Sequence, residues 1–182
     1  MTDRSLIEKT INSENVFSGK LLNVFNDGIE LPDGNKASRE YIKHVGAVCV
    51  VALTDDNKVI VERQYRYPMH EITLEIPAGK LDSKDEDPLE AAKRELREET
   101  GALADRMTYL GKFYPTPAYS DEVIHMYLAE GLSFGDQSLD DDEFLTIDLV
   151  PISELADRIL EGDIPDGKTQ AAILAVCRKL GL

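Results

Sequence analysis

The chain has little cysteine and no long hydrophobic run. Its 182 residues include only Cys49 and Cys177, without a CxxC pair. This excludes a disulfide framework and favours a reducing compartment. No apolar stretch approaches the ~20 residues that a membrane-spanning helix needs. Residues 1–10 lack the apolar core of a signal peptide. We therefore expect a soluble cytoplasmic protein with no membrane partner.

Positive charge is also scarce. The chain has 20 Lys and Arg against 35 Asp and Glu, which gives a formal net charge of −15. Such a chain lacks the positive field that binds nucleic acid or an anionic membrane, so neither is an expected partner. A hydrophobic content of 42% is ordinary for a globular protein, so the acidity does not indicate disorder. An acidic protein that binds phosphates would need metal ions to mediate the contact.

The apolar pattern predicts strands in the first half and helices later. Strands over residues 21–31 and 37–45 flank Pro32-Asp33-Gly34-Asn35, a turn sequence, and predict a hairpin. Val45–Leu53 is almost continuously apolar, as expected of a central strand buried on both faces. Residues 77–79 read as a sharp break. Further strands are expected over 59–66, 72–76, 107–113, 123–129 and 144–150, and helices over 88–100, 152–161 and 168–180.

Three glutamates crowd one face of the first predicted helix. Asp87 suits its N-cap and Gly101 its C-cap. Glu95, Glu98 and Glu99 then fall within about a quarter-turn of arc. Like charges so close together cost energy unless a cation compensates them, and Mg²⁺ is held by a few carboxylates plus substrate phosphates. From charge alone, a glutamate-rich surface helix is an equally good interpretation.

The spacing of the whole segment decides between these interpretations. Residues 94–101, RELREETG, match the second half of the Nudix box, R-E-U-x-E-E-x-G. Glu86 precedes Arg94 at the box spacing, and Gly79 is the opening glycine, with one extra residue between Gly79 and Glu86. The chain resembles the Nudix hydrolase superfamily.

Flanking segments resemble one subfamily, the ADP-ribose pyrophosphatases. They are RQYR at 63–66, LEIPAGK at 74–80 and YPTPAYSDE at 114–122. Pro117 lies sixteen positions after Gly101, as in that subfamily. The resemblance implies an α+β fold, a Nudix-type α/β/α sandwich with a mixed β-sheet and an N-terminal antiparallel β extension. Residues 1–44 would form this extension, for dimerisation and substrate contacts, and residues 45–182 the hydrolase domain of a homodimer.

The resemblance also implies roles for individual residues. The metal ligands, for Mg²⁺ or alternatively Mn²⁺, would be Glu95, Glu98, Glu99 and the Ala78 carbonyl. Glu98 and Glu99 would also be catalytic. The residues that contact substrate would be Arg39, Glu40, Arg66, Glu75 and Pro117. The residues that shape the loop and helix of the box would be Gly79, Glu86, Arg94 and Gly101.

The acidic run at 140–143 has two interpretations. It is either a solvated loop, the usual fate of a charge run, or a loop that carries the general base. By resemblance we assign the base to Glu143, and the other acidic residues of the run remain alternatives. A base on a loop could approach only when substrate neutralises the site.

The implied activity is Mg²⁺-dependent hydrolysis of the diphosphate bond of ADP-ribose, to AMP and ribose 5-phosphate, by a metal-activated water. Another nucleoside diphosphate sugar, such as ADP-glucose or GDP-mannose, is the alternative substrate. A non-catalytic nucleotide-sugar sensor is an alternative of another class. All three box glutamates are intact and no basic helix-turn-helix segment is present, which disfavours the sensor.

Overall fold

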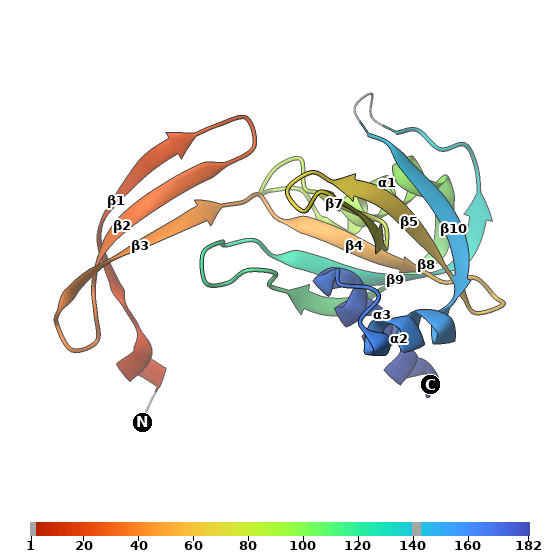
Figure 1. Cartoon of the computed structure of the whole chain (residues 1–182). Coiled ribbons are helices and arrows are strands. Elements are labelled where there is room, and N and C mark those ends of the chain that lie inside the picture. Colours follow the sequence, from red (N-terminus) through yellow and green to blue (C-terminus); the bar gives the residue numbers. More distant parts are fainter. Residues whose placement is uncertain (1–2, 140–142) are drawn as a thin grey trace. The chain divides into compact units, whose positions relative to one another are not determined.

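A computed structural model describes residues 3–139 and 143–182, and the chain divides into two compact units (Figure 1). Unit 1 consists of Met1–His44 and Thr116–Val123, and unit 2 of Val45–Pro115 and Ile124–Leu182. The predicted boundary after residue 44 coincides with one junction between the units. The segment 116–123 belongs to unit 1, although it is distant from the other residues of that unit in sequence.

Unit 1 is a three-stranded antiparallel sheet in the order β1-β2-β3, preceded by a short 3₁₀ helix, η1. The predicted hairpin is confirmed by β2 and β3, in which Phe25 lies opposite Tyr41. The β1 strand was not predicted, because its residues are mostly polar and every one of them is exposed. The bounds are η1 Asp3–Leu6, β1 Lys9–Ser18, β2 Asn23–Glu30 and β3 Lys36–Lys43.

The segment 116–123 attaches to the end of β3 through its backbone. Ile42 N donates to the Tyr119 carbonyl at 2.9 Å, and Asp121 N donates back to the Ile42 carbonyl at 3.1 Å. The His44 backbone N–H also donates to Asp121 Oδ1 at 2.6 Å. Pro117 is therefore carried by a segment that is anchored to the N-terminal sheet.

Unit 2 contains two sheets and three helices, which confirms the predicted α+β class. One sheet has the order β7-β4-β9-β8, with β4 parallel to β9 and antiparallel to β7; the other is antiparallel, in the order β10-β5-β6. Its strands are β4 Ala47–Ala52, β5 Lys58–Arg66, β6 Glu71–Glu75, β7 Ala78–Lys80, β8 Ala102–Phe113, β9 Ile124–Phe134 and β10 Leu145–Pro151. Its helices are α1 Pro88–Thr100, α2 Ile152–Glu161 and α3 Gly167–Leu180.

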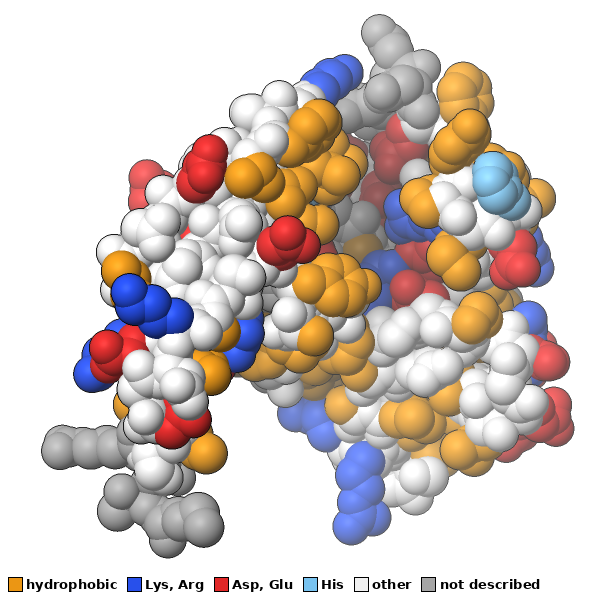
Figure 2. Space-filling view, turned by 60° about the vertical axis from the view of Figure 1, so that its left-hand side comes forward, with side chains coloured by type: hydrophobic (Ala, Val, Ile, Leu, Met, Phe, Trp, Pro, Cys, Tyr) orange, Lys and Arg blue, Asp and Glu red, His pale blue; other side chains and the backbone are white. Residues whose placement is uncertain are grey.

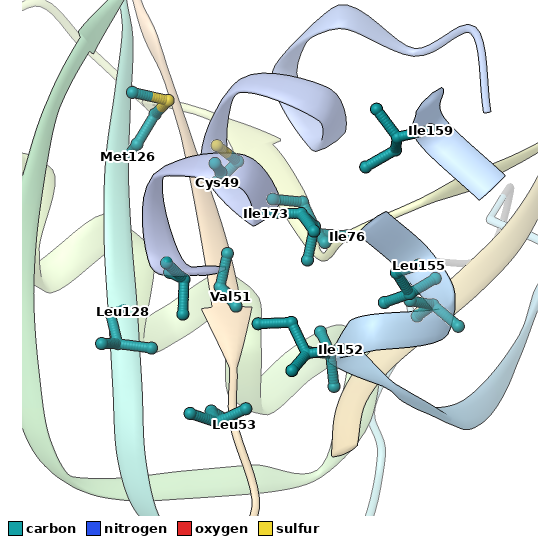
Figure 3. Close-up of a cluster of buried hydrophobic side chains, with 14 of the residues drawn as sticks. Cys49, Val51, Leu53, Ile76, Met126, Leu128, Ile152, Leu155, Ile159 and Ile173 are labelled. Carbon is teal, nitrogen blue, oxygen red and sulfur yellow. The ribbon is translucent and has the colours of Figure 1, made fainter. Parts of the chain in front are cut away.

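The β4 strand separates two hydrophobic cores. All six of its residues are buried, as predicted for a central strand. Because side chains alternate along a strand, Cys49 and Val51 join the core formed with α2 and α3 (Figure 3), whereas Val48 and Val50 join the core under α1. The helices thus cover opposite faces of this sheet.

The α1 helix begins and ends as predicted. Asp87 Oδ1 accepts from Leu89 N at 2.9 Å, and Gly101 ends the helix with a φ of 70°. Ala92 and Leu96 face the core beneath it, which turns the carboxylates of the last two turns toward β7 and β5. None of the helices in the described residues is long and apolar enough to cross a membrane.

The structure also differs from the prediction at β7 and β8. Residues 78 and 79, expected to be part of a break, belong to β7, which pairs Ala78 with Cys49 and Gly79 with Val48. The β8 strand begins at Ala102, five residues before the predicted start at Met107, because its pairing with β9 continues through residues 102–106, which show no alternation of apolar and polar side chains. Neither extension has a strong apolar signal.

Candidate active site

The three predicted metal ligands on α1 form a graded series from interior to surface. Glu99 is buried, whereas the side chains of Glu95 and Glu98 are 13% and 32% exposed. Glu99 Oε2 accepts from Ala78 N at 2.9 Å, so the end of α1 is joined to β7. The structure therefore brings Ala78 and the α1 carboxylates together.

Arg94 compensates the two more exposed carboxylates. Its Nη1 donates to Glu95 Oε1 at 2.8 Å and to Glu98 Oε2 at 3.2 Å. On its other side the guanidinium reaches Glu86 Oε1 at 3.4 Å and the Lys80 carbonyl at 3.3 Å. Arg94 thus ties the loop before the helix to the carboxylate face of α1.

Gly79 leaves room for one of these carboxylates. A Cβ atom added at Gly79 would overlap the carboxyl group of Glu95. The space that a side chain would fill is therefore held open beside α1. Burial raises the pKa of Glu95, and the nearby Arg94 opposes this change.

Glu99 is the carboxylate whose charge is most strongly disfavoured. Burial, followed by the negative charges of Glu62, Glu95 and Glu143, raises its pKa to about 10. The N–H of Ala78 acts in the opposite direction but does not outweigh these effects. A group in this position ionises fully only when a cation joins the site.

Glu62 of β5 is a site residue that the sequence reasoning missed. It is 0% exposed, and neither carboxylate oxygen has a hydrogen-bond partner among residues 3–139 and 143–182. Burial, followed by the charge of Glu75, raises its pKa to about 8. One signal in the sequence could have identified Glu62. It directly follows the apolar run Val59–Val61, at a position where the alternation of the strand predicts a buried side chain.

Glu143, the predicted base, lies close enough to the cluster for its charge to raise the pKa values of Glu62, Glu95 and Glu99. The alternatives in the same run, Asp140, Asp141 and Asp142, lie outside the described residues.

The residue chemistry fits a hard divalent cation, which prefers carboxylate and carbonyl oxygens. Glu62 leaves two buried oxygens without partners, and Gly79 leaves space at Glu95. In the described part of the chain, no three His, Cys, Asp or Glu side chains already surround a common metal position. Glu95 and Glu98 are instead held by Arg94, and Glu99 by the Ala78 N–H. On metal binding, these three carboxylates would replace their present hydrogen-bond partners in the protein with the cation.

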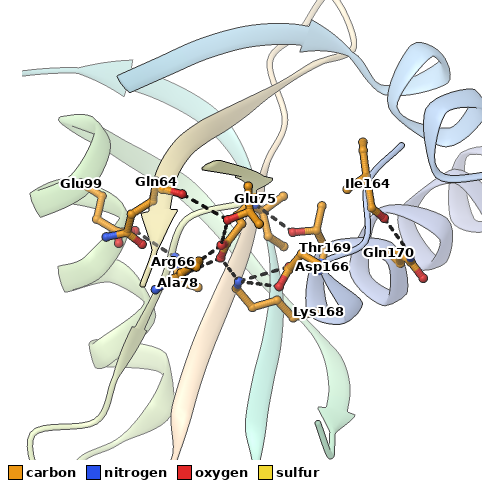
Figure 4. Close-up of polar contacts among 12 residues, drawn as sticks. Gln64, Arg66, Glu75, Ala78, Glu99, Ile164, Asp166, Lys168, Thr169 and Gln170 are labelled. Carbon is orange, nitrogen blue, oxygen red and sulfur yellow. Dashed lines mark hydrogen bonds and ion pairs between the residues drawn. The ribbon is translucent and has the colours of Figure 1, made fainter. Parts of the chain in front are cut away.

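Glu75 is the centre of a second polar cluster (Figure 4). Arg66 donates to both of its oxygens, from Nε at 2.7 Å and from Nη2 at 2.6 Å, and Thr73 Oγ1 donates at 2.6 Å. Lys168 of α3 also donates to Glu75 and contacts both oxygens of Asp166 at 3.1 Å. Burial alone would raise the pKa of Glu75, but the bonds from Arg66 and Lys168 lower it to about 2.

Lys168 was not predicted as a site residue. It is a buried cation, 9% exposed, and it extends from the first turn of α3 to β6. Its neighbour Thr169 accepts from Ile76 N at 3.0 Å, so two successive residues fasten α3 to the end of β6. The sequence around Lys168, Gly167-Lys168-Thr169, contains no charge pattern that predicts a buried cation.

The remaining predicted substrate contacts belong to unit 1. Arg39 pairs with Glu8, to which its Nε donates at 3.0 Å. Glu40 lies beside Arg39 on β3, opposite Asn26. Pro117 lies in the segment 116–123. The structure thus assembles the predicted site within unit 2 and leaves these three residues on a separate unit.

The chain matches a family model and is similar to several known proteins. The NUDIX domain family model matches residues 43–171, which include all of α1. The ADP-ribose pyrophosphatase of Bacillus subtilis (strain 168) is 42% identical over 93% of this chain and 92% of its own length. The methanol dehydrogenase activator of Bacillus methanolicus is 44% identical over 91% of this chain and 90% of its own length. A crystal structure of an ADP compounds hydrolase superposes with a TM-score of 0.84 at 26% identity, over 97% of this chain and 96% of that one.

The family match extends over most of the chain, and the structural match includes the N-terminal strands as well as the domain that carries α1. Together with the box spacing and the assembled carboxylates, these matches confirm the resemblance seen in the sequence. The chain belongs to the Nudix family.

Proposed function

We propose that this protein hydrolyses the diphosphate bond of ADP-ribose, or of a closely related nucleoside diphosphate sugar, to AMP and ribose 5-phosphate. The observation that carries the proposal is the row of α1 carboxylates, Glu95, Glu98 and Glu99, held beside Ala78 in unit 2. The name of the Bacillus subtilis relative supports ADP-ribose as the substrate.

A divalent cation, Mg²⁺ or Mn²⁺, would be held by these three carboxylates and the Ala78 carbonyl. When bound, it supplies charge neutralisation at the diphosphate and a more acidic water. Arg94 is a preformed counterion that pairs with both Glu95 and Glu98. This arrangement explains how a chain of net charge −15 can bind an anionic substrate.

Glu143 would serve as the general base. Its carboxylate accepts a proton from the attacking water as the water oxygen bonds to one phosphorus. The bridging P–O bond breaks, and the second phosphate leaves with the electron pair. Support comes from the charge of Glu143, which raises the pKa values of Glu95 and Glu99.

Substrate recognition would use residues of both units. In unit 2, Arg66 would offer its half-exposed guanidinium to a phosphate, with Glu75 fixing its orientation through two hydrogen bonds. In unit 1, Arg39, Glu40 and Pro117 would complete the contacts. We also propose a homodimer that forms through the N-terminal sheet.

The test is a mass-spectrometric screen of ADP-ribose, ADP-glucose and GDP-mannose with Mg²⁺ or Mn²⁺. We expect AMP and ribose 5-phosphate from ADP-ribose, and loss of turnover when EDTA is added. Preferential cleavage of another sugar nucleotide would change the substrate assignment. Tight binding of a sugar nucleotide without cleavage would refute the proposed hydrolysis and favour a non-catalytic sensor.

The Bacillus methanolicus relative suggests a second candidate, the activation of a dehydrogenase. Its identity of 44% is as high as that of the pyrophosphatase. The test is to measure the turnover of a methanol dehydrogenase with and without this protein. A rate that rises only with the intact Glu98 and Glu99 would show that activation uses the same site.

A further inference from the structure

Glu62 is a buried carboxylate without the partners that such groups normally have. It is the last of four consecutive buried residues in β5, and its side chain is 0% exposed. Among residues 3–139 and 143–182, neither Oε1 nor Oε2 accepts a hydrogen bond. Burying a charge in this way costs several kcal/mol unless it is paired or binds a metal. An apolar side chain would fill the position at no such cost.

The cations nearest to Glu62 are already used. Glu75, which lies opposite Glu62 on β6, binds Arg66 through two hydrogen bonds and also receives Lys168. Lys168 is bound in addition to both oxygens of Asp166. The two cations therefore form their hydrogen bonds with Glu75 and Asp166, and neither donates one to Glu62.

Glu62 lies on the face of β5 that packs against α1. Of the charges that affect Glu99, that of Glu62 is the strongest. Ile60, two residues earlier on the same face of β5, packs in the core under α1 together with Leu96. Glu62 thus continues this face from the core to the carboxylates of α1, at the buried end of their series.

We propose that Glu62 is a fourth carboxylate of the cation site, which approaches from β5 and faces Glu99 at the buried end of the site. It would bind the divalent cation directly or through a water, opposite the three ligands of α1. This inference rests on the metal part of the proposed function and adds a residue outside the Nudix box. The cation would give Glu62 the polar partner that its oxygens lack among the described residues.

The test uses the full-length protein and Mn²⁺ alone, without substrate. Mn²⁺ affinity is measured by electron paramagnetic resonance or calorimetry, and thermal unfolding is followed with and without the metal. Glu62→Gln keeps the shape and removes the charge. Glu71→Gln, on the exposed surface of β6, is the matched control.

We expect two opposite effects from Glu62→Gln. The metal-free variant should unfold at a higher temperature than the wild type, because the folded state no longer buries an ionisable carboxyl group. Its Mn²⁺ affinity should fall roughly 10- to 100-fold, and the metal-induced rise in unfolding temperature should shrink accordingly. Glu71→Gln should change neither quantity. Glu62→Leu serves as a second variant if the amide impairs folding.

Wild-type Mn²⁺ affinity in both Glu62 variants would overturn the inference and make Glu62 a purely structural group. A wild-type protein that binds no Mn²⁺ would overturn it too, together with the metal part of the proposed function. A wild-type protein that binds Mn²⁺ through Glu62 but cleaves no sugar nucleotide would support this inference and refute the proposed reaction.

Discussion

Glu62 and Glu75 lie directly opposite each other on β5 and β6, yet their pKa values move in opposite directions. Burial and the neighbouring Glu75 raise the pKa of Glu62 to about 8, whereas Arg66 and Lys168 overcome burial and lower that of Glu75 to about 2. Both carboxyl groups are almost fully buried. The distribution of cations, and not burial, therefore determines which of the two is ionised.

The low pKa of Glu75 predicts acid sensitivity. A carboxyl group whose pKa is lowered by folding stabilises the protein above its ordinary value of 4.5, and this contribution is lost as the pH falls toward about 2. For Glu75 the contribution is at most about 3 kcal/mol. Urea unfolding between pH 6 and pH 3 should show a loss of stability that is smaller in Glu75→Gln. Parallel curves for the two proteins would contradict the prediction.

Removing the charge of Lys168 should destabilise unit 2. Lys168→Met leaves Glu75 and Asp166 without their shared buried cation, so we expect a loss of about 3–5 kcal/mol in the free energy of unfolding. The double variant with Glu75→Gln should be more stable than the sum of the single effects predicts. Additive losses in chemical denaturation would show that the pair is not coupled.

Glu99→Gln tests the predicted metal ligand. We expect turnover to fall by about 10²–10³-fold, since a ligand that serves the transition state contributes several kcal/mol. The fold should be retained, because the amide oxygen of Gln can still accept the hydrogen bond from Ala78 N. The matched control is Glu90→Gln on the exposed side of the same helix, where Glu90 pairs with Lys93. Near wild-type turnover in Glu99→Gln would refute the assignment.

Gly79→Ala should impair the site more than the fold. The added methyl group would displace the carboxyl group of Glu95, which lies at the end of a flexible side chain and can move at small cost in stability. We expect weaker Mg²⁺ binding and lower turnover. The melting temperature should be almost unchanged. In the control, Gly135→Ala, the new Cβ would lie 3.7 Å from the Gly101 carbonyl oxygen, an ordinary contact.

The N-terminal sheet should form a dimer. Apolar side chains are exposed at the surface of the protein, as the space-filling view shows (Figure 2), and on β1 they include Ile11, Val16 and Phe17. Burial of these three side chains against a second copy would remove them from water. We expect sedimentation to report a dimer, and Ile11→Lys combined with Val16→Lys to weaken it. A wild-type protein that sediments strictly as a monomer would exclude this arrangement.

The sequence predicted best where local chemistry determines the structure. The caps at Asp87 and Gly101 and the buried run at 47–52 were confirmed because hydrogen-bonding side chains and apolar patterns act locally. The β1 and β7 strands could not be predicted, since pairing with other strands, and not the pattern of their own residues, makes them extended.

Prediction of the site residues was limited in the same way as prediction of the strands. The box spacing predicted Glu95, Glu98 and Glu99 because they lie on one helix. Glu62 and Lys168 join the site only through tertiary structure, from a strand and a helix that are far from the box in sequence. No spacing rule connects residues that approach each other in this way.

The pairing register of β4 has a consequence for catalysis, although this strand offers no chemical group to a ligand. Cys49 lies opposite Ala78, whose N–H holds Glu99, and Val48 lies opposite Gly79, which leaves room for Glu95. A slip of one residue would exchange the two hydrophobic cores and at once misalign both carboxylates. An apolar strand thereby sets the alignment of a charged site, and evolution can change its side chains only if this alignment is kept.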